Sequence, residues 1–280
     1  MVNVDFHIHT SYSDGGKTPA EIINLCKEND IGYISITDHN TFRFHKENSN
    51  KDFGLKIIRG MEVEVEYNKE ISFHILLYNF DLNSKLLKEY YKKNRKYEIY
   101  HFNKEIELCE KLFNITIDKN IKRKFIRSNN YFDKVRLNNL LVECKLANDP
   151  REAYYKYTKD IKETKRYRLS LEDFFKLGKD SGGIASLAHP LCYNMSLGQI
   201  EKIILELKNK YNLRVVEAIN NRQTLEDEKE LIKFCKNNNL YISCGSDTHY
   251  KYGDNSDRSI GKIINRKIDE KEVTFLELLK

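Results

Sequence analysis

His7 and His9 lie two positions apart in the N-terminal stretch VDFHIHT, at the end of a segment with the composition of a β-strand. Alternate residues of a strand project from the same face, so both imidazoles can be directed toward one point. Two imidazoles at this spacing can hold one divalent metal ion. An H-x-H pair alone is a weak indication of a metal site, so the prediction depends on whether further donors accompany it.

Further histidines and carboxylates follow other predicted strands. In an α/β barrel the C-terminal ends of the strands gather reacting groups at one mouth. Ordinary surface residues would be scattered over helices and loops as well. The sequence therefore predicts a site for several metal ions with nine candidate ligands: His7, His9, Asp14, His39, Glu62, His74, His189, Asp247 and His249.

Three residues near these candidates allow other interpretations. Asp38 either hydrogen-bonds a ligand imidazole and sets its tautomer or caps the end of its strand. Glu64 follows Glu62 on the same strand face and competes with it for the ligand role. His45 lies in a polar stretch, and we expect it to be an ordinary surface residue.

The composition excludes several classes of protein. Of the 280 residues, 40% are hydrophobic and 32% are charged, which is too apolar for a disordered chain. The apolar runs are too short to span a membrane, and the N-terminus lacks the apolar run of a signal peptide. The six cysteines are scattered without a C-x-x-C pair, unlike those of zinc ribbons or disulfide scaffolds. We expect a cytoplasmic protein with reduced cysteines, no membrane association and no obligate protein partner.

Strand and helix patterns alternate in both outer parts of the chain, which indicates parallel βαβ units. The predicted strands are Val2–His7, Tyr33–Thr37, Lys56–Arg59, Glu62–Tyr67, Ile71–Leu77, Gly183–Ala188, Arg214–Ile219 and Leu240–Gly245. Between them we expect helices at 18–29, 170–179, 197–211 and 224–238, with a short helix at the C-terminus. The middle is predicted to be helical at 84–112, 133–147 and 151–160. The pattern is that of an α/β barrel, formed by 1–83 and 170–280, interrupted by a helical insert at 84–169.

The positive charge of the chain is concentrated in this insert. Residues 85–168 contain 23 Lys and Arg against 12 Asp and Glu, whereas the rest of the chain is net negative. Such a segment is either a set of solvated helix faces or a lid that attracts an anionic substrate. Tyrosines are interleaved with the lysines and could stack on bases, although tyrosines at helical spacing more often belong to a core.

The motifs HIHTSYSDG, ITDHN, GME, FH, AHP and GSDTH occur in that order. This series resembles that of the polymerase and histidinol phosphatase (PHP) superfamily, and it covers about residues 1–80 and 170–260. Within the superfamily the chain is most similar to the stand-alone phosphoesterases, which act on nucleotide phosphates or trim RNA 5′ ends. The resemblance implies a distorted (β/α)7 TIM-like barrel with an inserted helical subdomain, which agrees with the pattern of elements.

The resemblance also implies three divalent metal ions. One would be bound by His7, His9, Glu62 and Asp247, a second by Glu62, His74 and His189, and a third by Asp14, His39 and His249. The Gly60-x-Glu62 spacing of the family favours Glu62 over Glu64. Imidazole and carboxylate ligands without thiolate suit Mn²⁺, Zn²⁺ or Fe²⁺. On resemblance, Mn²⁺ is expected to support activity best.

Clustered divalent ions lower the pKa of a bridging water and stabilise charge on phosphate oxygens, so the expected reaction is attack of a metal-bridging hydroxide on phosphorus. We expect Asp247, His249 and Glu62 to be catalytic. Fixed cations for the phosphate are expected among residues that could equally be surface residues: Arg127, Lys134, Arg136 and Arg222.

The expected substrate is a phosphorylated small molecule of the nucleotide class or a short single-stranded RNA. Three alternatives remain open at this point. They are a phosphatase of a small metabolite such as histidinol phosphate, an amidohydrolase, and a non-catalytic metal-stabilised module that binds nucleic acid.

Overall fold

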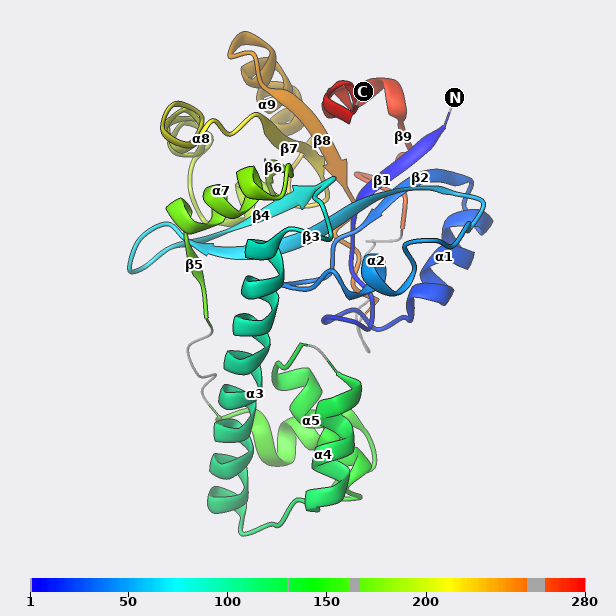
Figure 1. Cartoon of the computed structure of the whole chain (residues 1–280), viewed down its shortest axis with the longest axis vertical. Coiled ribbons are helices and arrows are strands. Elements are labelled where there is room, and N and C mark those ends of the chain that lie inside the picture. Colours follow the sequence, from blue (N-terminus) through cyan, green and yellow to red (C-terminus); the bar gives the residue numbers. More distant parts are fainter. Residues whose placement is uncertain (1, 130, 162–166, 251–259, 280) are drawn as a thin grey trace.

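The computed structural model describes residues 2–129, 131–161, 167–250 and 260–279. Its hydrogen-bonded sheet has the strand order β8-β7-β6-β4-β3-β2-β1-β9, and β5 pairs with β3 (Figure 1). The strands are β1 (Asn3–Ile8), β2 (Ile31–Ile36), β3 (Lys56–Glu66), β4 (Ser72–Tyr78), β5 (Leu169–Ser170), β6 (Ile184–Leu187), β7 (Val215–Asn220), β8 (Tyr241–Gly245) and β9 (Ile268–Asp269).

The ends of this sheet meet, which nearly closes a barrel. Beyond β8, the Thr248 carbonyl accepts a hydrogen bond from the His9 amide at 3.1 Å, and the Asp247 amide donates to the His7 carbonyl at 2.9 Å. A Cβ atom added to Gly245 would lie 2.1 Å from the Cβ of His7, so glycine allows this close approach. β4 runs antiparallel to both β3 and β6, whereas the β1–β2, β2–β3, β6–β7 and β7–β8 pairs are parallel. The predicted distorted barrel is confirmed.

The third strand is longer than predicted. We expected separate strands at Lys56–Arg59 and Glu62–Tyr67, but β3 is continuous through Gly60 and Met61. Its antiparallel pairing with β4 runs without interruption from Gly60 opposite Tyr78 to Glu66 opposite Ser72. The ladder hydrogen bonds of this hairpin keep the backbone extended where the sequence suggested a break.

The helices around the barrel follow the predicted alternation. They are α1 (Pro19–Glu28), α7 (Leu171–Asp180), α8 (Leu197–Tyr211) and α9 (Leu225–Asn237), and the short α2 (Arg43–Glu47) was not predicted. Thr18 and Glu21 form a reciprocal capping box at the start of α1. The predicted C-terminal helix is instead two 3₁₀ turns, at Glu270–Glu272 and Thr274–Leu279. None of the helices in the described ranges is long and apolar enough to cross a bilayer.

The insert leaves the barrel as one long helix and folds back toward it (Figure 1). It contains α3 (Lys85–Phe113), α4 (Lys119–Ser128), α5 (Lys134–Glu143), α6 (Pro150–Ala153) and a π-helical turn at Tyr154–Thr158. The helix predicted at 133–147 ends earlier, and half of the one predicted at 151–160 is this π turn. Residues 162–166 of the predicted insert lie outside the described residues. The insert has a hydrophobic core separate from that of the barrel, centred on Phe102, Ile106, Phe125, Leu137 and Leu141.

Candidate metal centre

All nine candidate ligands converge at the mouth of the barrel. The elements that carry them are the strands β1, β3 and β4 and the loops that follow β1, β2, β6 and β8. Seven of the nine are buried, and His74 and His249 are half-buried. The potential ligand atoms of all but His189 fall into three overlapping groups, and within each group every atom lies within 4.8 Å of the others.

The first group is formed by His7, His9, Glu62 and Asp247. Glu62 Oε2 lies 3.2 Å from His7 Nε2 and 3.1 Å from His9 Nε2. Asp247 Oδ1 lies 3.6 Å and 3.5 Å from the same two nitrogens. Two imidazole nitrogens and two carboxylates therefore face one small space, in the combination that the resemblance implied.

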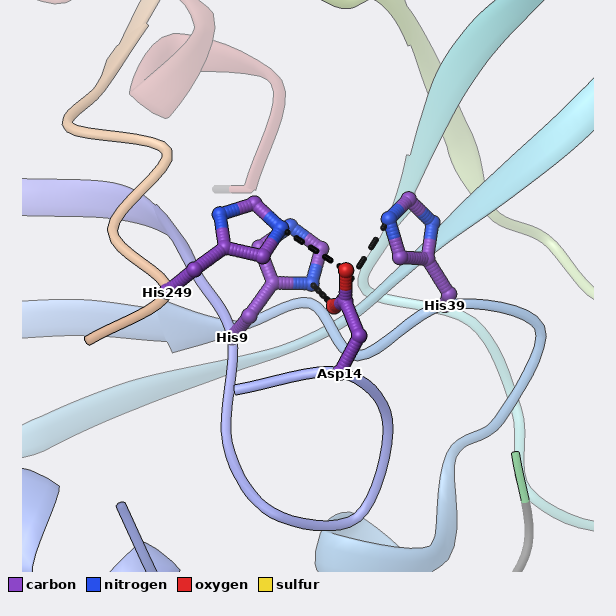
Figure 2. A group of neighbouring side chains, drawn as sticks. All are labelled: His9, Asp14, His39 and His249. Carbon is purple, nitrogen blue, oxygen red and sulfur yellow. Dashed lines mark ion pairs between the residues drawn. The ribbon is translucent and has the colours of Figure 1, made fainter. Parts of the chain in front are cut away.

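The second group is formed by Asp14, His39, His249 and also His9 (Figure 2). Asp14 Oδ2 lies 3.3 Å from His249 Nε2, and Asp14 Oδ1 lies 3.6 Å from His9 Nδ1 and 3.9 Å from His39 Nε2. The rings of His9 and His249 stack at 4.2 Å. His9 thus faces two groups, one with each ring nitrogen, whereas we expected it in the first group only.

The third group is formed by His39, Glu62 and His74, whereas the resemblance implied His189 in place of His39. His189 lies beside this group and contacts Glu62. Glu62 Oε1 lies 2.9 Å from His74 Nδ1 and 3.0 Å from His189 Nε2. His39 Nδ1 approaches Glu62 Oε2 at 3.2 Å. The two oxygens of Glu62 therefore face different groups of imidazoles, as a bridging carboxylate must.

The polar atoms of this centre fit a cation better than they fit one another. Glu62 Oε2 is fully buried and has no hydrogen-bond partner within the described chain, although three imidazole nitrogens lie within 3.2 Å. His7 Nε2 and His9 Nε2 lie 3.0 Å apart, and ligating nitrogens must both be unprotonated. A buried carboxylate needs a cationic partner, and mixed imidazole and carboxylate donors suit Mn²⁺, Zn²⁺ or Fe²⁺.

The pKa values describe the centre without metal. Burial would lower the pKa of His9, but the Asp247 and Glu62 carboxylates outweigh it and raise the pKa to about 9. Burial also opposes protonation of His189, but Cys192 and Glu62 raise its pKa to about 10. Burial would raise the pKa of Glu62, yet the neighbouring imidazoles hold it well below its usual value. Without metal, His9 and His189 therefore hold protons beside ionised carboxylates, and a metal ion must displace those protons to bind.

Two of the candidate ligands have a strained backbone. His189 has φ of 27° and Asp247 has φ of 52°, in the left-handed region that residues other than glycine rarely adopt. The Asp247 conformation is held by its amide hydrogen bond to His7, and the His189 amide donates to Glu217 Oε2 at 2.7 Å. Such strain persists only where the surrounding structure imposes it, and it is concentrated at functional sites.

Glu217 is the functional residue that the sequence analysis missed. It is fully buried in β7, and its Oε1 lies 2.9 Å from His7 Nδ1. A carboxylate on Nδ1 holds the proton there and leaves Nε2 of His7 available as a ligand. The available indication was a single acid in the otherwise apolar strand VVEAI, since a buried carboxylate must have a partner.

The three ambiguous residues are resolved by their contacts. Asp38 accepts hydrogen bonds from the Thr10 amide at 2.8 Å and from the hydroxyls of Thr10 and Ser13 at 2.7 and 2.6 Å, so it positions the loop that carries Asp14. The Glu64 carboxylate forms an ion pair with Arg168 at 2.6 Å and accepts a hydrogen bond from the Ser72 hydroxyl, so its described partners are not candidate ligands.

The prediction for His45 was wrong. His45 is buried in α2, and its Nε2 lies 2.8 Å from the Ile36 carbonyl oxygen and 3.0 Å from the Gly60 amide nitrogen. It therefore contacts the end of β2 and the middle of β3. The surrounding polar residues hid this role, because α2 turns its polar residues outward and packs the ring of His45 inward.

The four predicted phosphate-binding cations occupy different environments. Arg222 donates to Asp247 Oδ2 from Nε at 3.1 Å and from Nη2 at 2.8 Å, so it lies at the centre. Arg136 donates from Nη2 to the carbonyls of Ser11 and Ser13, which clamps the Asp14 loop to the insert. Lys134 is half-buried at the start of α5, and Arg127 is exposed near the end of α4.

The insert also reaches the centre through an aromatic residue. The ring of Tyr131, just before α5, stacks on the ring of His39 at 5.6 Å with an interplanar angle of 21°. On α3, the Tyr90 hydroxyl donates to Asn40 Oδ1 at 2.7 Å, directly beside His39. The insert therefore forms one wall of the space above the candidate ligands.

The chain is similar to known proteins over most of its length. The profile of the PHP domain family matches residues 5–244. The 5′-3′ exoribonuclease Rnm of Escherichia coli (strain K12) is 26% identical over 257 residues, which are 88% of this chain and 84% of that protein. The 3′,5′-nucleoside bisphosphate phosphatase of Chromobacterium violaceum is 24% identical over 253 residues, which are 89% and 88% of the two chains.

Two solved structures are similar over nearly the whole chain. An amidohydrolase from Chromobacterium violaceum, with bound sulfate and no metal, has a TM-score of 0.74 at 22% identity and covers 99% of this chain and 96% of its own. A candidate metal-dependent phosphoesterase from Bifidobacterium adolescentis has a TM-score of 0.72 at 19% identity, with coverages of 94% and 92%. At these identities the likeness concerns the fold.

Proposed function

Because the chain belongs to the PHP domain family, we propose that it is a metal-dependent phosphoesterase that hydrolyses phosphate esters of nucleotides or of short RNA 5′ ends. The observation that carries this proposal is the buried Glu62 carboxylate. Its two oxygens face separate groups of imidazoles, and one oxygen has no hydrogen-bond partner within the described chain. The full-length relatives named exoribonuclease and nucleoside bisphosphate phosphatase support the choice of substrate class.

We propose that the centre holds three divalent ions, with Mn²⁺ as the preferred metal. The ligands would be the nine converging side chains, with Glu62 shared between groups and His9 facing two of them. Divalent ions held in this way act as Lewis acids toward phosphate oxygens and lower the pKa of coordinated water, which is the chemistry that phosphate ester hydrolysis requires.

The residues of the chain position and orient the groups of this centre. The Nδ1–H of His249 donates to the Asp247 carbonyl at 2.9 Å. This leaves Nε2 of His249, which lies on the side of Asp14, unprotonated and available as a metal ligand. Arg222 holds the second oxygen of Asp247, so that Oδ1 faces the histidines. We therefore assign Asp247, His249 and Glu62 to the catalytic centre, where they would hold the ions that act on a phosphate ester.

The four cations would contribute to phosphate binding in different ways. Arg222 is about one-third exposed and lies beside Asp247, so it is the closest fixed cation to the reacting group. Arg136 acts through the Asp14 loop rather than through the phosphate, because its guanidinium is occupied by backbone carbonyls. Arg127 and Lys134 lie on the insert, where they could contact a second phosphate of a nucleotide or an oligonucleotide.

The experiment is a comparison of phosphate ester substrates. The protein is stripped of metal with a chelator and reloaded with Mn²⁺. Phosphate release is then followed from a nucleoside 3′,5′-bisphosphate, and shortening is followed for a 5′-phosphorylated oligoribonucleotide. Hydrolysis of either substrate that depends on Mn²⁺ is expected. Inactivity on both, with the ions shown to be bound by elemental analysis, would contradict the proposal, and activity on histidinol phosphate alone would replace it.

A further inference from the structure

The most strongly charged surface of the insert is α4. Its ten residues include five cations and no acid: Lys119, Lys122, Arg123, Lys124 and Arg127. Four of the five are exposed, and Lys122 is half-buried. None of the five forms an ion pair with any residue in the described ranges. By contrast, the exposed face of α9 alternates acids with lysines. Like charges four residues apart on a helix repel one another, so these cations do not stabilise α4 through their mutual interactions.

Three of these cations form a row. Lys119, Arg123 and Arg127 stand four residues apart and therefore lie one above the other on one face of the helix. The row spans about 12 Å along the helix axis, from the rise of about 1.5 Å per residue. The opposite side of α4 is held in the insert core by Phe125, with Ile121 and Ile126 beside it. The cations are thus presented to solvent by a helix whose packing does not need them.

The row leads to the rim of the candidate metal centre. α4 runs back along α3 toward the barrel (Figure 1), and Arg95 of α3 donates to the carbonyls of Ile126 and Asn129 at 2.9 and 2.7 Å. At the end of the row, the Ser128 carbonyl accepts from Nη1 of Arg43 at 3.1 Å. Arg43 is the first residue of α2. Its guanidinium carbon lies 4.2 Å from the centre of the Tyr12 ring, and Tyr12 belongs to the loop that carries Asp14.

We propose that this row of cations is the binding track for the phosphodiester backbone of a single-stranded RNA whose 5′ end lies in the metal centre. The inference rests on the proposed function and specifies its substrate class as a polymer. A mononucleotide bound at the centre is too short to reach Lys119, whereas successive phosphates of a strand can contact cations along the whole helix. Because these contacts are electrostatic, they do not depend on sequence, as the stepwise degradation of arbitrary RNA requires.

The test separates binding from hydrolysis. The triple variant Lys119→Gln/Arg123→Gln/Lys124→Gln removes three exposed cations and leaves Arg127 in place. The control Lys202→Gln/Lys229→Gln/Lys236→Gln removes the same charge from exposed positions on α8 and α9, at the opposite end of the molecule (Figure 1). Binding of a 3′-labelled RNA of about ten nucleotides is measured by fluorescence anisotropy with the metal chelated, at salt concentrations from about 50 to about 300 mM.

The α4 variant is expected to bind the RNA at least tenfold more weakly than the control variant. The slope of log affinity against log salt should fall by about 2, since each phosphate contact of a single strand contributes about 0.7. With Mn²⁺, KM for the oligonucleotide should rise to a similar extent, whereas kcat/KM for the nucleoside 3′,5′-bisphosphate should stay within about twofold.

Two outcomes would overturn the proposal. One is equal RNA affinity and equal salt slope in the two triple variants. The other is displacement of the RNA by poly-glutamate as readily as by unlabelled RNA, which would make the row a general polyanion surface. If the wild type hydrolyses neither substrate, the proposed function fails, but the binding measurement with chelated metal still decides whether the track exists.

Discussion

Glu62 is the residue on which the metal centre depends most. Its carboxylate is buried. Imidazole nitrogens of five candidate ligands lie within 3.2 Å of one or other of its oxygens: His7, His9, His39, His74 and His189. An isolated buried carboxylate is strongly unfavourable, so Glu62 requires cations beside it. Protonated imidazoles supply the positive charge when no metal is bound, and metal ions would supply it when they are.

Asp247 should be essential for activity but not for folding. In Asp247→Asn one anionic donor of the first group is lost while the backbone hydrogen bond to His7 can remain. Mn²⁺-dependent phosphate release should fall by more than about 100-fold, since even changes behind the ligands commonly cost 10–100-fold. Circular dichroism and the melting temperature in chelator are the control for folding. Retention of full activity would show that the site is wrongly assigned.

Glu217→Gln should weaken metal binding while the nine candidate ligands remain in place. Glutamine keeps the shape of the side chain but removes the charge that orients His7, so Mn²⁺ affinity should fall by about 10–100-fold. Isothermal titration of chelator-treated protein measures this affinity. A structural role alone would predict a lower melting temperature with unchanged Mn²⁺ affinity. Glu64→Gln, at a half-buried carboxylate that pairs with Arg168 and Ser72, is the matched control.

At the scale of elements, the loops between strands and helices are held in place by buried polar side chains. Asp38 holds the loop after β1, and the buried Asp5 accepts hydrogen bonds from the amides of Ser246 and Gly261, which joins β1 to the segments beyond β8. His45 does the same for β2 and β3. These hydrogen bonds therefore help to position the ligand-bearing loops.

His45 gives this arrangement a measurable pH dependence. Burial lowers its pKa from 6.5 to about 4. In the unfolded chain His45 is therefore protonated below about pH 6.5, whereas in the folded chain it stays neutral until the pH falls to about 4. The stabilisation by the neutral ring is fully present above pH 6.5 and is lost as the pH falls through this window. The wild type should lose up to about 3 kcal/mol of unfolding free energy from this residue between pH 7 and 4.

Urea unfolding of wild type and His45→Gln across this range isolates the contribution, because the other titrating groups are common to both proteins. The variant should be less stable at pH 7 but should lose less stability on acidification. His101→Gln, on α3 of the insert, is the control and should follow the wild type. Parallel stability curves for wild type and His45→Gln would contradict the assignment.

At the scale of the whole molecule, a barrel with an acidic balance of charge carries a basic insert that contacts its mouth. The insert has its own core and meets the barrel through polar contacts such as that of Arg43 with Ser128, and through the guanidinium of Arg136. This arrangement places positive charge around the entrance to a centre of ionised carboxylates, and it favours the approach of an anionic substrate.

Metal binding should stabilise the whole fold and should do so more strongly at higher pH. The pKa of about 9 for His9 and about 10 for His189 means that both are protonated at neutral pH without metal, so Mn²⁺ must displace their protons. Affinity should therefore rise from pH 6.5 to pH 8. At a ligand concentration of about 100 Kd the gain is about 2.7 kcal/mol, which corresponds to a rise in melting temperature of about 5 °C or more.

Differential scanning fluorimetry of chelator-treated protein, with and without Mn²⁺ at the two pH values, measures this effect. Glu62→Gln, which removes the shared carboxylate, should abolish most of the Mn²⁺-induced rise. A rise of equal size at both pH values would mean that the histidines are not protonated before the metal binds.

Much of the fold followed from local patterns. The helix Leu197–Tyr211 was predicted to the residue, and in the structure Ser196 caps its start and Asn212 follows its end in the left-handed conformation. β3 was divided wrongly because its continuity depends on pairing with β4 rather than on its own residues. α2 was missed because five residues are too few for a helical period to show.

The sequence by itself determined which side chains converge at the mouth. The alternation of strand residues and the placement of donors at strand ends are local properties, and a barrel turns them into a common location. The tertiary structure decided how the donors are grouped, that Glu217 stands behind His7, that His45 is buried, and that Arg136 clamps a loop. These depend on the register between strands far apart in the chain and on the docking of the insert, where a shift of one residue would direct each side chain elsewhere.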